Sequence, residues 1–281
     1  NLSINHQLDF TQIFSVLKEL PELEEVILSN CKMKEMPIEL LELKQLKKLD
    51  IAHNQIKTLP EQLSKLENLE ELILDGNPLQ SLKSDFFQLK GLKKLFARNC
   101  ELETLPEEIR HLHQLQVLAL NNNNLITLPQ NVMHLQFLKE LHLNDNALES
   151  LPETLGLLEE LVRINLKNNQ IKELPQQLRW GKIYKLDLEN NQLNTLPESV
   201  VNCKYLNEIK LRGNHITSLP DSLSDLTAYY FNIDISHNGL TKVPEVLGKI
   251  KQLRTLNLSH NRLTSLPDEL SNAHQLYYLR A

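Results

Sequence analysis

Long apolar runs and clusters of basic residues are both missing from this chain. No apolar stretch reaches the roughly 18 residues that a membrane-spanning helix needs, so the sequence predicts no membrane span. The formal net charge is -6 at pH 7 and lysines and arginines form no run, which argues against nucleic acid or an anionic membrane as a partner. Aromatic residues supply only 5% of the chain, so another residue type must fill the core.

Cysteine is also scarce, and its three positions suggest no disulfide. Cys31 and Cys100 occupy equivalent positions three repeats apart in the pattern described below. At about 4.8 Å per strand they would lie roughly 14 Å from each other, which is too far for a disulfide. Cys203 falls between Val200 and Leu206 and is predicted to be a small buried hydrophobic residue.

Leucine is what the chain has in abundance, and it recurs in one pattern from end to end. In the stretch 115–138, Leu118 and Leu120 have the period of a strand with one face buried. After Pro129 the apolar residues are three apart, which suits a 3₁₀ or short helical return: Val132, Leu135 and Leu138. Such a unit cannot bury its leucines alone, so copies must stack into a solenoid.

A column of asparagines fixes the register of the repeats. The spacing is 23 residues except for 22 after Asn169 and 24 after Asn214. The asparagine amide can donate to and accept from backbone groups that a tight turn leaves without partners, so the column predicts a buried ladder. Its members are Asn54, Asn77, Asn123, Asn146, Asn169, Asn191, Asn214, Asn238 and Asn261, with Cys31 and Cys100 in two further slots.

The pattern LxxLxLxxNxLxxLP, which runs from Leu23 to Ala281, resembles the leucine-rich repeat of bacterial proteins and of intracellular Ras-signalling scaffolds. The resemblance implies an α/β solenoid: an open horseshoe with a parallel sheet on its concave face and short helical, 3₁₀ or extended returns on its convex face. We expect residues 1–22 to form an N-terminal capping helix or degenerate repeat, with Asp9 and Gln12 as a capping box. Residues 23–281 then form eleven full units and the start of a twelfth, and the stop in mid-strand suggests a fragment of a longer protein.

Three units break the pattern. One has Lys83 in place of proline, and we expect Phe86 to fill the core position and Phe87 to lie exposed. A second is one residue short, and Trp180 is expected to fill the space of a missing leucine. A third has one residue more than the regular unit and contains three consecutive aromatic residues. Its strand segment is expected to start at Tyr230. A core repaired after an insertion or deletion is favoured over a recognition feature in each.

The strand face that the core does not cover carries three columns of side chains. Charges in the third and seventh positions of the unit mostly alternate between neighbouring strands and can satisfy one another. The fifth position is apolar in its first half, where nothing in the repeat requires it, which predicts a protein-binding surface. The predicted partner-binding residues are Ile27, Ile73, Phe96, Arg98, Val117, Ala119 and His142. The alternative is that the isoleucines only favour strand structure.

The sequence gives no support for catalysis, a metal or a cofactor. Regular strands hold their side chains in a shallow open array, whereas catalytic groups must converge in a pocket. His237 and His260 occupy equivalent positions on adjacent repeats, with Asp234 nearby as the one further ligand candidate. We therefore expect two solvent-facing histidines there.

The resemblance implies a non-catalytic module that binds a protein partner through its concave sheet. The rival hypothesis is a substrate- or regulator-binding arm of a larger signalling protein or enzyme, since leucine-rich repeats are joined to GTPase modules in Roco proteins and to ubiquitin-ligase domains in bacterial effectors. The lack of disulfide-bonded end caps, common in extracellular relatives, favours the cytoplasm over a secreted or bacterial surface location. We expect a monomer unless the open C-terminal end pairs.

Overall fold

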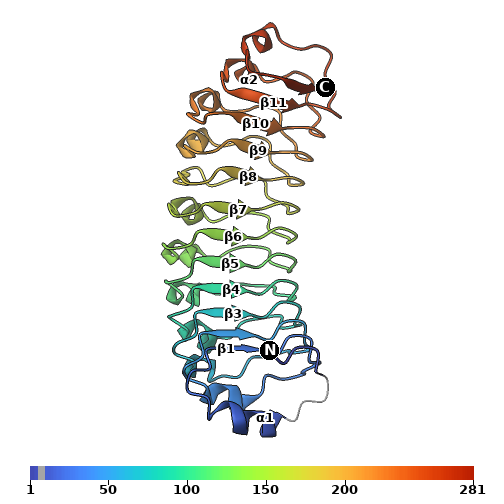
Figure 1. Ribbon diagram of the computed structural model, residues 1–281. Helices are drawn as coiled ribbons and strands as arrows, with labels where there is room; N and C mark the ends of the chain where they lie inside the picture. The colour runs from blue at the N-terminus through green and yellow to red at the C-terminus, as the bar shows by residue number, and fades with distance from the viewer. Residues whose placement is uncertain (6–9) are drawn as a thin grey trace. The chain divides into compact units, whose positions relative to one another are not determined.

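The computed structural model describes residues 1–5 and 10–281, and these residues form twelve short β-strands that follow one another in chain order (Figure 1). The chain divides into two compact units, one of residues 1–125 and 131–138, the other of residues 126–130 and 139–281. The first unit holds β1 (Glu25–Ile27), β2 (Lys48–Asp50), β3 (Glu71–Ile73), β4 (Lys94–Phe96) and β5 (Val117–Ala119). The second holds β6 (Glu140–His142), β7 (Arg163–Asn165), β8 (Lys185–Asp187), β9 (Glu208–Lys210), β10 (Phe231–Asp234), β11 (Leu253–Asn257) and β12 (Tyr278–Arg280).

Short helical returns connect most of the strands. Most of the 3₁₀ turns begin directly after the position of the repeat proline, whose fixed φ suits the start of a helix, whereas η2 begins three residues after Pro60. The returns are η1 (Ile38–Glu42), η2 (Leu63–Lys65), η3 (Ser84–Gln88), η4 (Glu107–His111), η5 (Gln130–His134), η6 (Glu153–Leu157), η7 (Glu198–Asn202), η8 (Asp221–Asp225), α2 (Val246–Lys249) and η9 (Asp268–Asn272). Parallel strands paired in chain order, with short helical returns, confirm the predicted α/β solenoid.

The asparagine ladder is present, and Asn214 shows its geometry. The Oδ1 atom of Asn214 accepts from the amide of Leu193 at 3.0 Å, and its Nδ2 atom donates to the carbonyls of Leu188 at 2.9 Å and Leu211 at 3.0 Å. Cys100 takes over part of this role, since its thiol donates to the carbonyl of Leu74 at 3.4 Å. Burial raises the pKa of the Cys100 thiol to about 11, so the donor proton is retained near neutral pH.

Asn214→Ala is expected to lower the free energy of unfolding by about 1 to 3 kcal/mol, because buried turn groups lose their partners. The measurement is urea denaturation followed by circular dichroism. Asn214→Cys should lose less, since a thiol in this column can still donate. The exposed Asn194→Ala is the control, and equal losses for Asn194→Ala and Asn214→Ala would contradict the ladder's role.

The N-terminal end of the first unit is covered by chain that precedes β1. The helix α1 (Phe10–Leu17) lies within the predicted N-terminal segment and buries Phe14, while the expected cap residue Asp9 lies outside the described residues. The sequence did not predict that residues near the terminus also pair with β1. The amide of Leu2 donates to the carbonyl of Ile27 at 2.8 Å, and the amide of Ile4 to Ser29 at 3.1 Å. The carbonyls of Ile27 and Ser29 at this edge of the sheet are thereby paired.

The phenylalanine pair in the unit without its proline is packed differently from the prediction. Phe86 fills the core position as expected, but Phe87 is also fully buried, so its expected exposure is wrong. The two rings meet edge to face with centroids 5.2 Å apart. Burying a second ring in this contact removes apolar surface that would otherwise face water.

The two units of irregular length adapt in opposite ways. Trp180 is fully buried, and its Nε1 atom donates to the carbonyl of Leu155 at 3.1 Å, which confirms that it fills the short unit. In the long unit, Phe231 rather than Tyr230 takes the first leucine position, because it is fully buried and pairs with Leu253. The register then shifts between Phe231 and Asn232, and the expected strand start at Tyr230 is wrong by one residue.

Candidate functional site

Strand pairing brings most of the predicted partner-binding column together in the first unit. Ile73 lies directly opposite Phe96, and Phe96 opposite Ala119, on adjacent parallel strands. Val117 lies opposite Lys94 in the neighbouring column. Ile27 is further along, because Asp50 lies between it and Ile73 in the register. The central group is therefore Ile73 and Phe96 on β3 and β4.

Phe96 is half-buried and has a cation on its ring. The guanidinium carbon of Arg98 lies 5.2 Å from the ring centroid. Arg98 is held in place by the buried Asp75, whose carboxylate accepts from both the Nε atom at 2.9 Å and the backbone amide at 2.8 Å. A cation at this distance attracts the face of the ring, so the aromatic side chain and its arginine are ordered before any partner arrives.

Ala119 departs from the expected exposure. Its side chain is 2% exposed, although the sequence placed it on the open face. A methyl group is short, so the longer side chains around it on the sheet can cover it, and Ala119 offers a partner almost no surface. Ile27, Ile73 and Val117 are half-buried, as residues on an open strand face should be.

His142 belongs to the second unit and has a polar setting. Its Nε2 atom lies 3.2 Å from Oε2 of Glu140 on the same strand. It borders a hollow on the strand face together with Arg163, Asn165, Tyr184, Lys185 and Asp187. Arg163 already contacts Glu140 at 3.3 Å and the Tyr184 hydroxyl at 3.2 Å, so the polar groups here largely satisfy one another.

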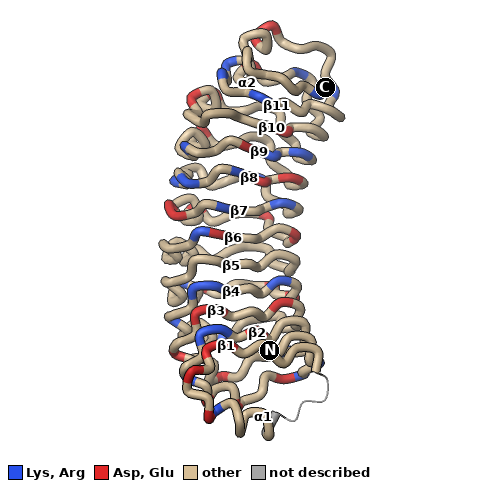
Figure 2. The backbone as a smooth tube through the Cα atoms, viewed as in Figure 1, with Lys and Arg blue, Asp and Glu red and all other residues tan. Residues whose placement is uncertain are grey.

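Figure 2 shows where the basic and acidic residues lie along the backbone. Their side chains on the strand faces pair across neighbouring strands, as the alternating columns predict. Glu71 lies between two lysines, with Lys48 Nζ at 3.1 Å and Lys94 Nζ at 3.0 Å. In the second unit, Glu189 contacts Lys167 at 2.7 Å and Lys210 at 3.4 Å. Such pairs are partly exposed and contribute about 0 to 1 kcal/mol each. They also leave the nearby charged groups with little to gain from a partner.

The Glu71 carboxylate gives this network a testable pH dependence. Burial alone would raise its pKa, but hydrogen bonds from Lys94 and Lys48 hold the pKa of Glu71 below its usual value. A lowered folded-state pKa stabilises the fold above the unfolded-state value of 4.5, and this stabilisation is lost as the pH falls through the folded value. We therefore expect Glu71→Gln to cost up to about 1 kcal/mol near pH 7 and progressively less in acid, as the pH falls through the folded-state pKa of Glu71.

Urea denaturation of the wild type and of Glu71→Gln, near pH 7 and in acid, measures the difference in the free energy of unfolding. Glu61, which is far more exposed and lies 3.9 Å from Lys83, provides the control substitution Glu61→Gln. A loss for Glu71→Gln that is equally large in acid would show that the carboxylate's charge is not responsible.

His237 and His260 stack on each other rather than diverge. Their ring centroids are 4.0 Å apart, and Nη2 of Arg212 lies 3.2 Å from Nε2 of His237. Burial lowers the pKa of His237, as do the charges of His260 and Arg212.

Within residues 1–5 and 10–281, no group of three or more His, Cys, Asp or Glu side chains is arranged to hold a metal ion. In the same residues, no helix is both long enough and apolar enough to cross a membrane.

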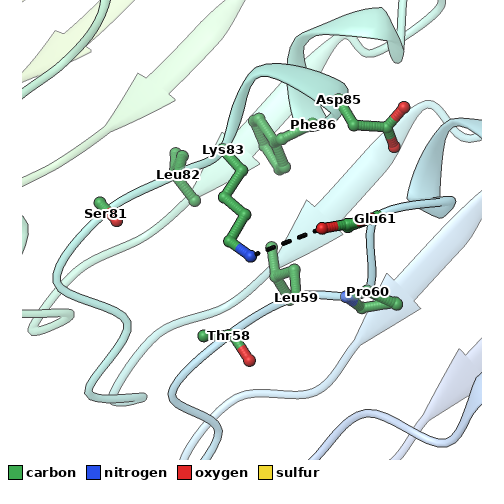
Figure 3. A pocket seen from close by; sticks show the side chains of 9 residues that line it. All are labelled: Thr58, Leu59, Pro60, Glu61, Ser81, Leu82, Lys83, Asp85 and Phe86. Atoms are coloured by element: carbon green, nitrogen blue, oxygen red, sulfur yellow. Dashed lines mark ion pairs between the residues drawn. The ribbon is translucent and has the colours of Figure 1, made fainter.

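A narrow hollow lies beside the unit whose proline is replaced by Lys83 (Figure 3). Lys83 Nζ is 3.9 Å from Oε1 of Glu61, and Asp85 accepts from the Ser64 hydroxyl at 3.2 Å. The charged groups at this hollow thus have partners within the chain, and nothing in its lining resembles a nucleophile with a base.

One surface that the sequence did not single out as a site is a groove beside β9 and β10. It is lined by Lys204, Tyr205, Asn207, Thr227, Ala228, Tyr229 and Tyr230. Tyr205 and Tyr229 are exposed, and Arg254 from β11 packs on Tyr229 and Tyr230. The signal in the sequence is the extra residue in this unit, for which the pattern favours a repaired core over a recognition feature.

Family models described as leucine rich repeat match residues 21–79, 67–125 and 252–273. Among solved structures, a leucine-rich-repeat protein of Leptospira interrogans is similar, with 26% identity, a TM-score of 0.66, and coverage of 95% of this chain and 86% of that one. A chain of the Toll–Spatzle complex of Drosophila has 26% identity, a TM-score of 0.81, and coverage of 95% and 37%. A chain of the TLR13 complex with ssRNA13 has 25% identity, a TM-score of 0.73, and coverage of 93% and 43%.

The chain therefore spans most of the Leptospira protein but less than half of the matched chains in the other two complexes. No curated protein sequence matches it. The matched structures place the fold among parallel-stranded repeat solenoids.

Proposed function

Because this chain is a leucine-rich-repeat protein, we propose that it is a non-catalytic interaction module that binds a protein partner through the exposed face of its first-unit strands. The observation that carries this proposal is the ordered group of Phe96, Arg98 and Asp75 beside Ile73. Rigid aromatic and arginine side chains are the types that dominate binding energy at protein interfaces. Their order in the free chain lowers the entropy lost on binding.

The charges around this group favour a protein over a nucleic acid. Glu71 and Lys94 already pair on the same face, and the chain carries a net charge of -6. A polyphosphate would meet no uncompensated basic surface there, whereas an apolar protein side chain would meet Ile73 and Phe96. The Toll–Spatzle complex shows that a similar chain occurs in a complex with such a partner, while the TLR13 complex contains ssRNA.

Affinity capture with matched variants tests the proposal. The wild-type chain, Phe96→Ala and Asn257→Ala are immobilised in parallel and exposed to a lysate of the source organism, and bound proteins are identified by mass spectrometry. A partner of this surface is retained by the wild type and by Asn257→Ala but not by Phe96→Ala. If every protein captured by the wild type is also retained by Phe96→Ala, the proposed surface is wrong.

A further inference from the structure

We propose that the groove beside β9 and β10, here called the tyrosine groove, is a second docking site, and that its ligand is an extended acidic peptide segment. The residues expected to contact the peptide are Lys204, Tyr205, Asn207, Tyr229, Tyr230 and the adjoining Arg254. All of these lie in the second unit, so this site is independent of the Phe96 surface.

The groove exists because one unit has an extra residue. Leu226 and Phe231 fill successive core positions but are five residues apart, where Cys203 and Leu206 in the preceding unit are three apart. The intervening chain must bulge outward, and only Ala228 within it returns to the interior. Tyr229 and Tyr230 are thereby freed from the core and form one wall, with Tyr205 on the preceding loop.

The exposed rings mark this groove as a contact surface. Tyr229 is 84% exposed and Tyr205 is 67% exposed. All six tyrosines of the chain fall at positions 184–278, within the second unit. Tyrosine offers a large apolar contact area at a low cost in side-chain entropy and is enriched where proteins bind one another. An apolar or aromatic ligand side chain would insert between these rings.

The charges at the groove select an acidic ligand. Among the residues that the structure describes, no aspartate or glutamate lines it. The guanidinium carbon of Arg254 lies 5.6 Å from the Tyr229 ring centroid and 5.3 Å from that of Tyr230. In the part of the chain that the structure describes, neither Arg254 nor Lys204 forms an ion pair with a carboxylate. A stacked guanidinium keeps its edge N–H groups free, and a ligand carboxylate is the group that matches them.

Asn207 provides the means to recognise a peptide backbone. Its side chain lines the groove and is half-buried, and among the described residues its amide forms no side-chain hydrogen bond. A primary amide can donate to a ligand carbonyl and accept from a ligand N–H, as an extended main chain requires. A single-stranded nucleic acid would also stack on tyrosines, but its phosphates would meet only two cations on a chain of net charge -6.

Selection from a library of short random peptides displayed on phage tests this proposal, with the whole 281-residue chain as bait. We expect the selected peptides to be enriched in aspartate and glutamate next to an apolar or aromatic residue. The best peptide, labelled with fluorescein, should bind at least about tenfold more weakly to Tyr229→Ala and to Arg254→Gln. Its affinity should also fall as salt is added.

Three matched variants serve as controls. Tyr277→Ala removes a ring that is 76% exposed but does not line the groove. Lys242→Gln removes an exposed cation outside the groove. Phe96→Ala removes the central aromatic ring of the first-unit surface. All three should bind the peptide as the wild type does. Loss of peptide binding in Phe96→Ala would show that the groove and the Phe96 surface are not independent sites.

Several outcomes would overturn the groove proposal itself. These are a selection that enriches no peptide, peptides without an acidic excess, and unchanged affinity in both Tyr229→Ala and Arg254→Gln. A labelled oligothymidine that binds more tightly than the best peptide, and loses binding in Tyr229→Ala, would assign the groove to single-stranded nucleic acid instead.

Discussion

Replacing Trp180 with alanine is expected to lower the free energy of unfolding by about 3 to 5 kcal/mol. Trp180 is the largest fully buried side chain. It stands in a unit that is one residue short, so the neighbouring residues have no spare side chain with which to fill the cavity. Removing the indole also leaves the carbonyl of Leu155 without the 3.1 Å hydrogen bond from Nε1.

The backbone in the two units that meet near Trp180 is already closely packed, so we expect little collapse into that cavity. A Cβ atom on Gly156 would clash with the carbonyl oxygen of Gln177, so the backbones at Gly156 and Gln177 already pack closely. At a site that relaxes little, the loss in the free energy of unfolding includes both the transfer free energy of the removed atoms and the cost of the cavity. This contact is why we expect a value at the upper end for a buried aromatic residue.

Urea denaturation followed by circular dichroism measures the loss, because the variant no longer has a tryptophan to report by fluorescence. Trp180→Phe keeps an aromatic ring but not the N–H donor, and should lose about 1 to 2 kcal/mol. Phe137→Ala, at a ring that is 54% exposed, should stay within about 0.5 kcal/mol of the wild type. A loss below about 1 kcal/mol for Trp180→Ala would mean that the short unit does not depend on the indole.

The regular part of the fold could be predicted because the residues at one position of the repeat have the same structural role in every regular unit. The spacing of Asn54, Asn77 and Asn123 fixed both the strand register and the hydrogen bonds that these amides make. Irregular units were harder, since a change in length can be absorbed at more than one place. The choice between Tyr230 and Phe231 as the core residue depends on which ring the loop can turn inward, and spacing alone does not contain that information.

The candidate site was predictable in position but not in exposure. Period-two alternation placed Ile73 and Phe96 side by side on the strand face, as the pairing shows. Exposure depends on the lengths of neighbouring side chains, which is why Ala119 is covered although its Cβ points outward. The contacts of Arg98 with Phe96 and Asp75 join side chains from two adjacent repeat units, so no single unit contains the whole group.

The second large effect is expected in binding rather than in stability. Phe96→Ala should weaken binding of the first-unit partner by at least about 2 kcal/mol, the usual threshold of a hot spot. The charged groups nearby already have partners, so the ring supplies most of the apolar area that a ligand can bury. Fold stability should fall by about 1 kcal/mol or less, because the half-buried ring lies outside the leucine layers.

Isothermal titration calorimetry with the captured partner measures the affinity, and urea denaturation measures the stability. Asn257→Ala, on the polar strand face of the second unit, should leave the affinity nearly unchanged. Arg98→Ala should weaken binding less than Phe96→Ala, and the double variant should lose less than the sum of the two, because Arg98 acts partly by ordering the ring at 5.2 Å. If Phe96→Ala instead lowers stability by several kcal/mol and spares binding, the ring belongs to the scaffold. The partner would then have to dock elsewhere, because the remaining apolar residues of the column are the half-buried Ile27 and Ile73 and the covered Ala119.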